Sequence, residues 1–156
     1  MKIFLTAVMC AIAFAVTSDV TAQISTIKVG VDGFTCSLCA KGVEGQFSAL
    51  DFISSVRTDL KNTTFTLGTK KSPEINFRMV REAVTDGGFT VREILVEGSG
   101  KVKIMQDGKI TVELSNAEEL EIHGAKVELT DKGEVEFKGK LSTDLKSVAI
   151  TEIRKL

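Results

Sequence analysis

The sequence predicts an α+β fold with two parts. Residues 23–97 follow the order strand, helix, strand, strand, helix, strand, whereas residues 98–156 contain short strands only. The first part is inferred from period-two alternation in its strands and from apolar stripes at helical spacing in its helices. The second part is inferred from turn signals that recur about every eight to ten residues, a spacing typical of a small antiparallel barrel or sandwich.

An apolar run opens the chain and predicts a secretory signal peptide over residues 1–22. Lys2 precedes the run 3–16, and the small residues at 20–22 occupy the usual cleavage offsets, so we expect cleavage after Ala22. A membrane anchor is the alternative, but about 14 apolar residues fall short of the roughly 20 that span a bilayer. We therefore expect export, with the periplasm as the compartment and no integral membrane segment after cleavage.

The charges of the remaining chain nearly balance. The full sequence has 20 Lys and Arg and 21 Asp and Glu, and the leader takes Lys2 and Asp19, which leaves 19 against 20. No block of like charge stands out, so a surface for nucleic acid or anionic membrane is not indicated. Trp and Tyr are absent, which argues against an aromatic surface for sugars or bases.

The first strand, the first helix and a hairpin are expected in that order after the leader. Residues 26–31 alternate between apolar and polar and predict a strand. Residues 37–50 place their apolar side chains on one helical face and predict a helix. Residues 53–60 and 63–67 then predict two strands joined by a tight turn.

A second helix and a last strand complete the first part. Ser72 is the expected N-cap and Pro73 the first helical residue. The apolar stripe of this helix comprises Ile75, Met79, Val80, Ala83 and Val84. The glycines at 87–88 end the helix, and residues 89–96 predict the last strand. Both helices should cover one face of a four-stranded antiparallel sheet, which is the split β-α-β, or ferredoxin-like, arrangement.

Two cysteines stand between the first strand and the first helix. Cys36 and Cys39 form a C-x-x-C loop there, whereas Cys10 leaves with the leader. The free N–H groups and the dipole of a helix N-terminus favour the thiolate form of a cysteine placed there. Two convergent thiolates suit a soft ion such as Cu(I), or Zn(II) with additional ligands. Cys36 and Cys39 are therefore the candidate metal ligands.

The same cysteines allow other interpretations. In an oxidising compartment they can form a plain disulfide in a cofactor-free interaction module. They can also exchange disulfides, because a C-x-x-C at a helix start is the thioredoxin arrangement as well. Thioredoxin-like proteins carry a proline loop opposite the cysteines, but the sole proline, Pro73, is assigned here to a helix start. No pair of nucleophile and base is evident, so we do not expect an enzyme.

The residues around the cysteines form a wider motif: Gly33-Phe34-Thr35-Cys36-Ser37-Leu38-Cys39, then Val43-Glu44 and Phe47-x-x-Leu50, with Gly88-Phe89 before the last strand. This motif resembles the heavy-metal-associated (HMA) domain family of copper chaperones, metal-ATPase N-terminal domains and periplasmic mercury-binding proteins. The resemblance covers about 75 residues, nearly half of the chain. It implies a metal bound by Cys36 and Cys39 and a Phe89 side chain packed near the loop.

Three positions depart from that family's pattern. Phe34 replaces the family's methionine but keeps an apolar side chain beneath the loop, and residues 51–53 replace its usual Gly-Val turn. Thr35 stands where relatives that hold Zn(II) often place aspartate as an extra ligand. The resemblance therefore favours Cu(I), with Zn(II) or Hg(II) as alternatives, and implies a chaperone or sequestering protein whose partner is another metal-transport protein.

Residues 98–156 carry no comparable motif. Alternating segments at 102–104 and 110–114 flank the hairpin signal Asp107-Gly108. Further short strands are expected at 120–122, 127–129, 135–137 and 148–150. Gly98-Ser99-Gly100 is the expected domain boundary. An oligonucleotide-binding-type barrel is one candidate, but basic and aromatic residues are too sparse to indicate that activity.

Three further side chains carry donor atoms that suit copper. His123 is the only histidine and falls in an expected turn, and Met79 and Met105 lie outside any methionine-rich run. We interpret both methionines as core residues. The second part is expected to bind no soft metal and to fix the orientation or the partner of the first.

Overall fold

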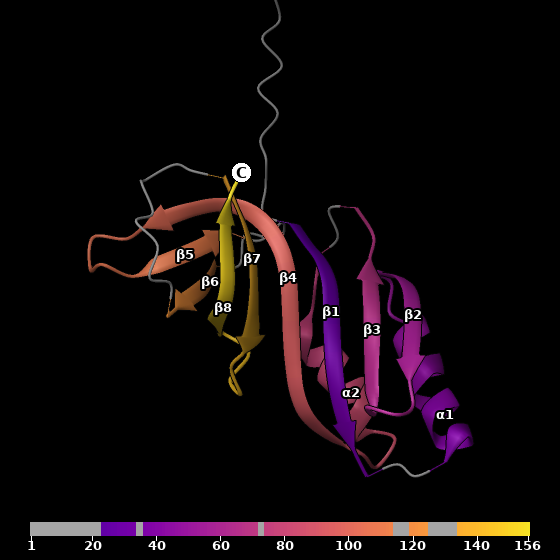
Figure 1. Ribbon diagram of the computed structural model, residues 1–156. Helices are drawn as coiled ribbons and strands as arrows, with labels where there is room; N and C mark the ends of the chain where they lie inside the picture. Colours follow the sequence, from indigo (N-terminus) through magenta and orange to yellow (C-terminus); the bar gives the residue numbers. More distant parts are fainter. Residues whose placement is uncertain (1–22, 34–35, 72–73, 114–118, 125–133) are drawn as a thin grey trace, which may run out of the picture.

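The computed structural model describes residues 23–33, 36–71, 74–113, 119–124 and 134–156 (Figure 1). The predicted signal peptide lies outside the described residues, as do Phe34, Thr35, Ser72, Pro73 and the expected strand at 127–129. Within the described ranges, no helix has the length and the apolar composition needed to cross a membrane.

Four antiparallel strands form the sheet of the first part. Their spatial order is β2 (Ile53–Asp59), β3 (Thr64–Thr69), β1 (Gln23–Asp32) and β4 (Thr90–Ile104). The central strand β1 alternates as its sequence predicts, with Ile27, Val29 and Val31 fully buried. The expected strands at 26–31, 53–60 and 63–67 are confirmed, each within a few residues.

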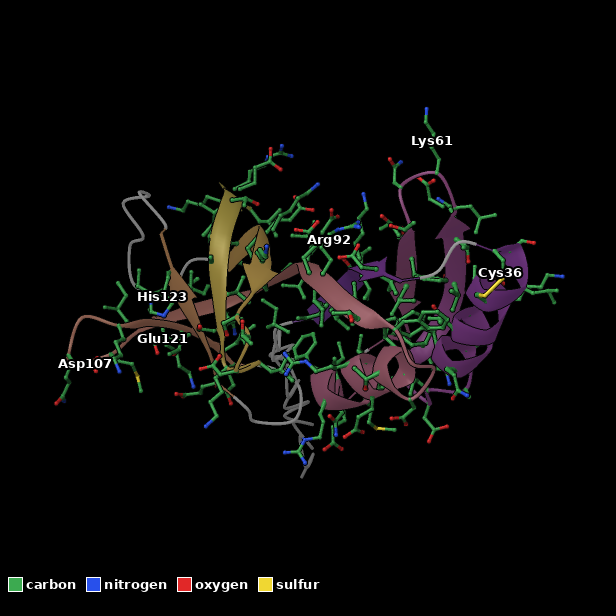
Figure 2. All side chains as sticks on the ribbon, turned by 90° about the horizontal axis from the view of Figure 1, so that it is seen from below. Cys36, Lys61, Arg92, Asp107, Glu121 and His123 are labelled. Atoms are coloured by element: carbon green, nitrogen blue, oxygen red, sulfur yellow. A yellow bond between two sulfur atoms is a disulfide. The ribbon has the colours of Figure 1, made fainter. Side chains whose placement is uncertain are left out.

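Two helices cover one face of this sheet (Figures 1 and 2). Helix α1 (Ser37–Ser48) buries Phe47, whose ring meets that of Phe65 on β3 edge to face at a centroid distance of 5.3 Å. Helix α2 (Phe77–Thr85) buries Val80 and Val84. We call this unit the helical lobe: β1, β2, β3, both helices and the part of β4 that pairs with β1. The predicted strand-helix-strand-strand-helix-strand order is confirmed.

The second helix starts later than the sequence predicts. Its N-cap is Asn76, whose side-chain oxygen Oδ1 accepts the N–H of Arg78 at 3.0 Å and of Met79 at 3.3 Å. Ser72 was therefore the wrong N-cap and Pro73 the wrong first helical residue, because the asparagine satisfies two free N–H groups closer to the apolar stripe.

Strand β4 continues past the helical lobe into a closed barrel. Its partners there are β7 (Glu134–Leu141), along Leu95 to Lys101, and β5 (Ile110–Glu113), along Val102 to Ile104. Strands β6 (Glu119–His123) and β8 (Ser147–Lys155) close the ring in the order β4-β5-β6-β8-β7-β4. The pair β6–β8 is parallel, and every other pair in the ring is antiparallel. Of the barrel and sandwich alternatives, the barrel is correct, but the expectation of a wholly antiparallel sheet is wrong at the pair β6–β8.

Glycines permit the close approach of strands in two places, between β1 and β4 and inside the barrel between β7 and β8. A Cβ added at Gly98 would lie 2.7 Å from the carbonyl oxygen of Gln23, and one added at Gly139 would lie 2.6 Å from that of Ala149. The residues expected to form a joint, Gly98, Ser99 and Gly100, therefore lie inside β4, paired with β1 or β7. The division of the chain into two domains at this point stays a prediction.

Candidate metal centre

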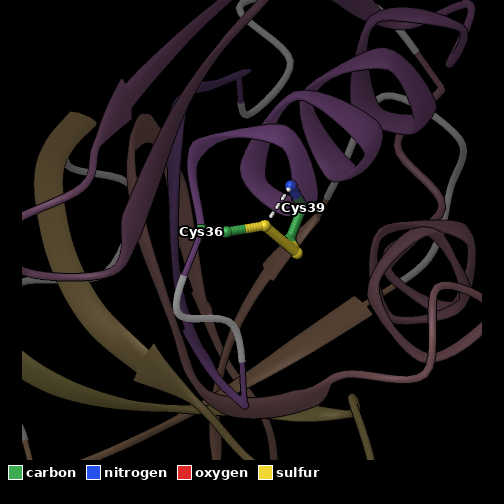
Figure 3. Close-up of a disulfide and its surroundings, with 2 residues drawn as sticks. All are labelled: Cys36 and Cys39. Atoms are coloured by element: carbon green, nitrogen blue, oxygen red, sulfur yellow. Dashed lines mark hydrogen bonds between the residues drawn. A yellow bond between two sulfur atoms is a disulfide. The ribbon is translucent and has the colours of Figure 1, made fainter.

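The cysteine loop joins the end of β1 to the start of α1. Gly33 has a φ of +101°, a left-handed conformation that side chains rarely adopt, and it turns the chain out of the strand. Cys36 has an extended backbone and is the N-cap of α1. Its sulfur accepts the N–H of Cys39 at 3.2 Å, in place of the hydroxyl or amide oxygen that usually caps a helix (Figure 3). The cap thus places this sulfur at the positive end of the helix dipole.

The structure brings the two predicted ligands together. Cys36 and Cys39 form a disulfide, with their Cα atoms 5.4 Å apart (Figure 3). Cys36 is exposed and Cys39 is half-buried against the core. The two bonded sulfurs therefore lie together at the surface, and Cys36 is the more exposed of the two residues.

The aromatic ring of Phe89 lies beside the start of this loop. A Cβ added at Gly33 would lie 3.7 Å from Cδ1 of Phe89, and one added at Gly87 would lie 3.0 Å from Cδ2. The backbone N–H of Phe89 also bonds to the carbonyl of Val84 at the end of α2. The expectation that Phe89 packs near the cysteine loop is confirmed.

Arg92 supports the same end of the sheet, although no sequence motif marks it. Its guanidinium bonds to the carboxylate of Asp32 at 2.7 Å and to the carbonyl of Asn62 at 3.1 Å. This cation links the end of β1 to the turn between β2 and β3. An arginine in an alternating strand gives no sequence signal that separates such a link from an ordinary exposed side chain.

The turn between β2 and β3 is held by its own acidic residue. Asp59 accepts the side-chain N–H of Asn62 at 2.7 Å and the backbone N–H groups of Lys61 and Asn62. The hydrogen bond from the Asn62 side chain is the main reason that the pKa of Asp59 lies below its usual value. The carbonyl of Thr63 accepts the N–H of Val31, which fixes this turn beside the strand that leads to the cysteines.

The other candidate donors do not join the cysteines. His123 lies on the barrel, at the opposite end of the molecule from Cys36 (Figure 2). Met79 and Met105 are each 41% exposed, so their interpretation as core residues was wrong. Across the described ranges, no group of three or more His, Cys, Asp and Glu side chains could hold a metal ion. Two sulfurs are therefore the donor set that the described residues provide.

Comparisons with known proteins give matches among solved structures alone. No family model and no curated protein matches the chain. The yeast copper transporter domain Ccc2a, in its apo and Cu(I)-loaded states, is 22% identical over 43% of this chain and 90% of its own, with a TM-score of 0.40. The CopZ metallochaperone is 24% identical over 43% of this chain and 98% of its own, with a TM-score of 0.40. Oxidized MerP from Ralstonia metallidurans is 22% identical over 46% of this chain and 99% of its own, with a TM-score of 0.37.

Proposed function

We propose that this protein is exported and captures a soft metal ion, Cu(I) above all, between the thiolates of Cys36 and Cys39. The observation that carries the proposal is the position of both sulfurs at the exposed N-terminus of α1, with Cα atoms 5.4 Å apart. The helix dipole and the N–H of Cys39 stabilise negative charge on the sulfur of Cys36. Soft thiolates select Cu(I) over the hard divalent cations.

Low coordination number favours Cu(I) over Zn(II) at this site. Zn(II) in proteins is almost always four-coordinate, and the described residues add no cluster of carboxylates or imidazoles to the two sulfurs. Two-coordinate Cu(I) or Hg(II) needs no further ligand. An open coordination sphere also suits transfer, because an incoming thiolate or thioether can add to the ion before one cysteine leaves.

Metal capture requires the reduced cysteines. Reduction of the Cys36–Cys39 disulfide consumes two electrons and two protons, which a dithiol reductant supplies while it becomes a disulfide itself. Each thiol then loses its proton when it binds the metal. The protein would thus act as a carrier or sequestering protein and not as an enzyme.

The exposed surface beside the cysteines suits a protein partner. Leu38 lies between the two cysteines and is 79% exposed. An apolar side chain beside a transferable ion gives an incoming partner a contact at the point where its own ligands must approach. We propose another metal-transport protein as this partner.

The direct test is a metal competition. The full protein is reduced, freed of reductant under anaerobic conditions and exposed in one experiment to Cu(I) with Zn(II) and in a second to Hg(II) with Zn(II), at equal concentrations. Bound metal is measured by elemental analysis. We expect about one soft ion per chain and no retained Zn(II). Retention of Zn(II), or no bound metal at all, would contradict the proposal.

Thiol–disulfide exchange is the second candidate, favoured by the disulfide itself. A redox catalyst should isomerise a scrambled disulfide substrate much faster than a free dithiol does. We expect stoichiometric reaction only. Repeated turnover in that assay would place exchange above metal transport.

A further inference from the structure

A cavity on the barrel combines three features that neither the fold nor the metal site explains. It has a volume of about 520 Å³, within the range of small-molecule sites. Its walls come from the start of α2, the hairpin between β4 and β5, the strands β5 and β6, and the turn before β8. Asp107 and Glu121, which border it, lie far from Cys36 (Figure 2).

The first feature is a buried hydroxyl group without a hydrogen bond. Thr111 lines the cavity and is 6% exposed, and its Oγ1 has no partner among the described residues. An unsatisfied buried polar group is costly, and native proteins contain few of them. A ligand that brings a hydrogen-bond donor into the cavity would supply the missing partner.

The second feature is a strained backbone in the cavity wall. Leu145 has a φ of +63°, although it carries a branched side chain. Non-glycine residues in this conformation are uncommon and concentrate at functional sites. The Leu145 side chain is partly buried against the core and lines the cavity.

The third feature is apolar surface left open to solvent. Met105 is 41% exposed and faces a cavity that Phe77 and Leu145 also line. Methionine adapts its shape to different ligands. These three side chains provide an apolar wall for a ligand of modest size.

The charges around the cavity indicate the sign of the ligand. Three carboxylates, those of Asp107, Glu119 and Glu121, border it together with the ammonium groups of Lys109 and Lys146. Lys109 pairs with Asp107 at 3.7 Å, which leaves Glu119, Glu121 and Lys146 as the other charged side chains that line the cavity. Lys103 attracts Glu119 electrostatically at longer range, but its ammonium group is hydrogen-bonded to the carboxylate of Glu113. The net charge of the remaining side chains around the cavity is negative, which favours a cationic ligand.

We propose that this cavity binds a small organic ammonium ion with an apolar body. The apolar body packs against Phe77, Met105 and Leu145, the ammonium group lies near Glu119 and Glu121, and one N–H donates to Thr111. The site is separate from the cysteines, so it is independent of the proposed metal transport.

Three probes that differ mainly in charge test the proposal. Phenethylammonium, 2-phenylethanol and 3-phenylpropionate are titrated into the ¹⁵N-labelled full protein with the Cys36–Cys39 disulfide intact. Saturable NMR shifts are expected at the amides of Thr111, Glu121 and Leu145 with phenethylammonium. Binding should be at least about threefold weaker for the alcohol and weaker still for the carboxylate. Equal binding of all three probes, or no saturable shift, would overturn the proposal.

Variants separate binding from structural effects. Glu121→Gln should weaken phenethylammonium binding at least about threefold, whereas Glu152→Gln, outside the cavity on β8, should leave it unchanged. Thr111→Val should weaken binding while the free protein keeps or gains thermal stability, because its hydroxyl has no partner to lose. If Glu121→Gln has no effect, or Thr111→Val leaves binding unchanged, the assigned contacts are wrong.

Discussion

The helical lobe and the barrel bury their apolar residues in different ways and share one strand. The lobe covers one face of its sheet with two helices, which bury Phe47 and Val80, and among the described residues no helix covers the other face. The barrel closes its sheet on itself and encloses Val112, Phe137 and Val148. Strand β4 pairs with β1 along one stretch and with β7 along an overlapping one. The cysteine pair thus lies in the lobe alone, whereas β4 contributes to the stability of both units.

The largest expected effect is the loss of Cu(I) from the lobe. Changing Cys36 and Cys39 together to serine should abolish Cu(I) binding, because neither hydroxyl group replaces a soft thiolate. The measurement is a Cu(I) titration against a competing chelator. The matched control changes the barrel donors, Met105→Leu with His123→Gln, and should leave the affinity unchanged. Loss of affinity in that control would show that the barrel supplies a ligand.

Removal of the barrel tests how far the lobe depends on the shared strand. A protein ending at residue 97 keeps both cysteines, so we expect the same one Cu(I) per chain. It loses β7, the partner of β4 from Leu95 onward, and exposes a strand edge that favours self-association. The melting temperature should fall by roughly 10 °C, which corresponds to about 2 kcal/mol for a domain of this size. A monomeric fragment of unchanged stability would establish two independent domains.

Matched glycine substitutions should act in opposite directions in the two units. Gly139→Ala places a Cβ 2.6 Å from the carbonyl oxygen of Ala149 in the barrel and should cost about 1–3 kcal/mol. Gly45→Ala, in α1, meets no atom within 4 Å and should add about 0.5–1 kcal/mol. Urea unfolding followed by circular dichroism suits a chain without Trp or Tyr. If Gly139→Ala is neutral, the closure of the barrel at β7 and β8 is looser than described.

The smallest expected effect concerns the contact between α2 and the barrel. Arg81 on α2 donates to the carbonyl of Thr143, in the turn before β8, at 2.6 Å. Arg81→Ala should cost about 0.5–1 kcal/mol, because this bond is exposed to solvent. Arg78→Ala on the same helix is the control and should change stability by less. Equal effects would show that the Arg81 contact adds nothing specific between the two units.

The sequence predicts the lobe better than the barrel for physical reasons. Alternation in β1 and the position of Cys36 before α1 are local signals, and the structure confirms both. The N-cap at Asn76 could not be separated from Ser72, because both residue types cap helices. Gly98 and Gly100 suggest a linker when read locally, but they lie in a strand whose partners are distant in sequence. The parallel pairing of β6 with β8 is equally non-local.

The sharing of β4 also makes the completion of both units depend on strands that are far apart in the sequence. Strand β1 is synthesised first, but its partner β4 follows only after residue 90, so the lobe cannot close until then. The edge of β4 between Leu95 and Lys101 stays unpaired until β7, which begins at Glu134, has formed and docked against it. Such distant pairings slow folding, and an unpaired edge in the interval invites aggregation. We therefore expect the chain to aggregate most readily in any state in which β4 has formed and β7 has not yet paired with it.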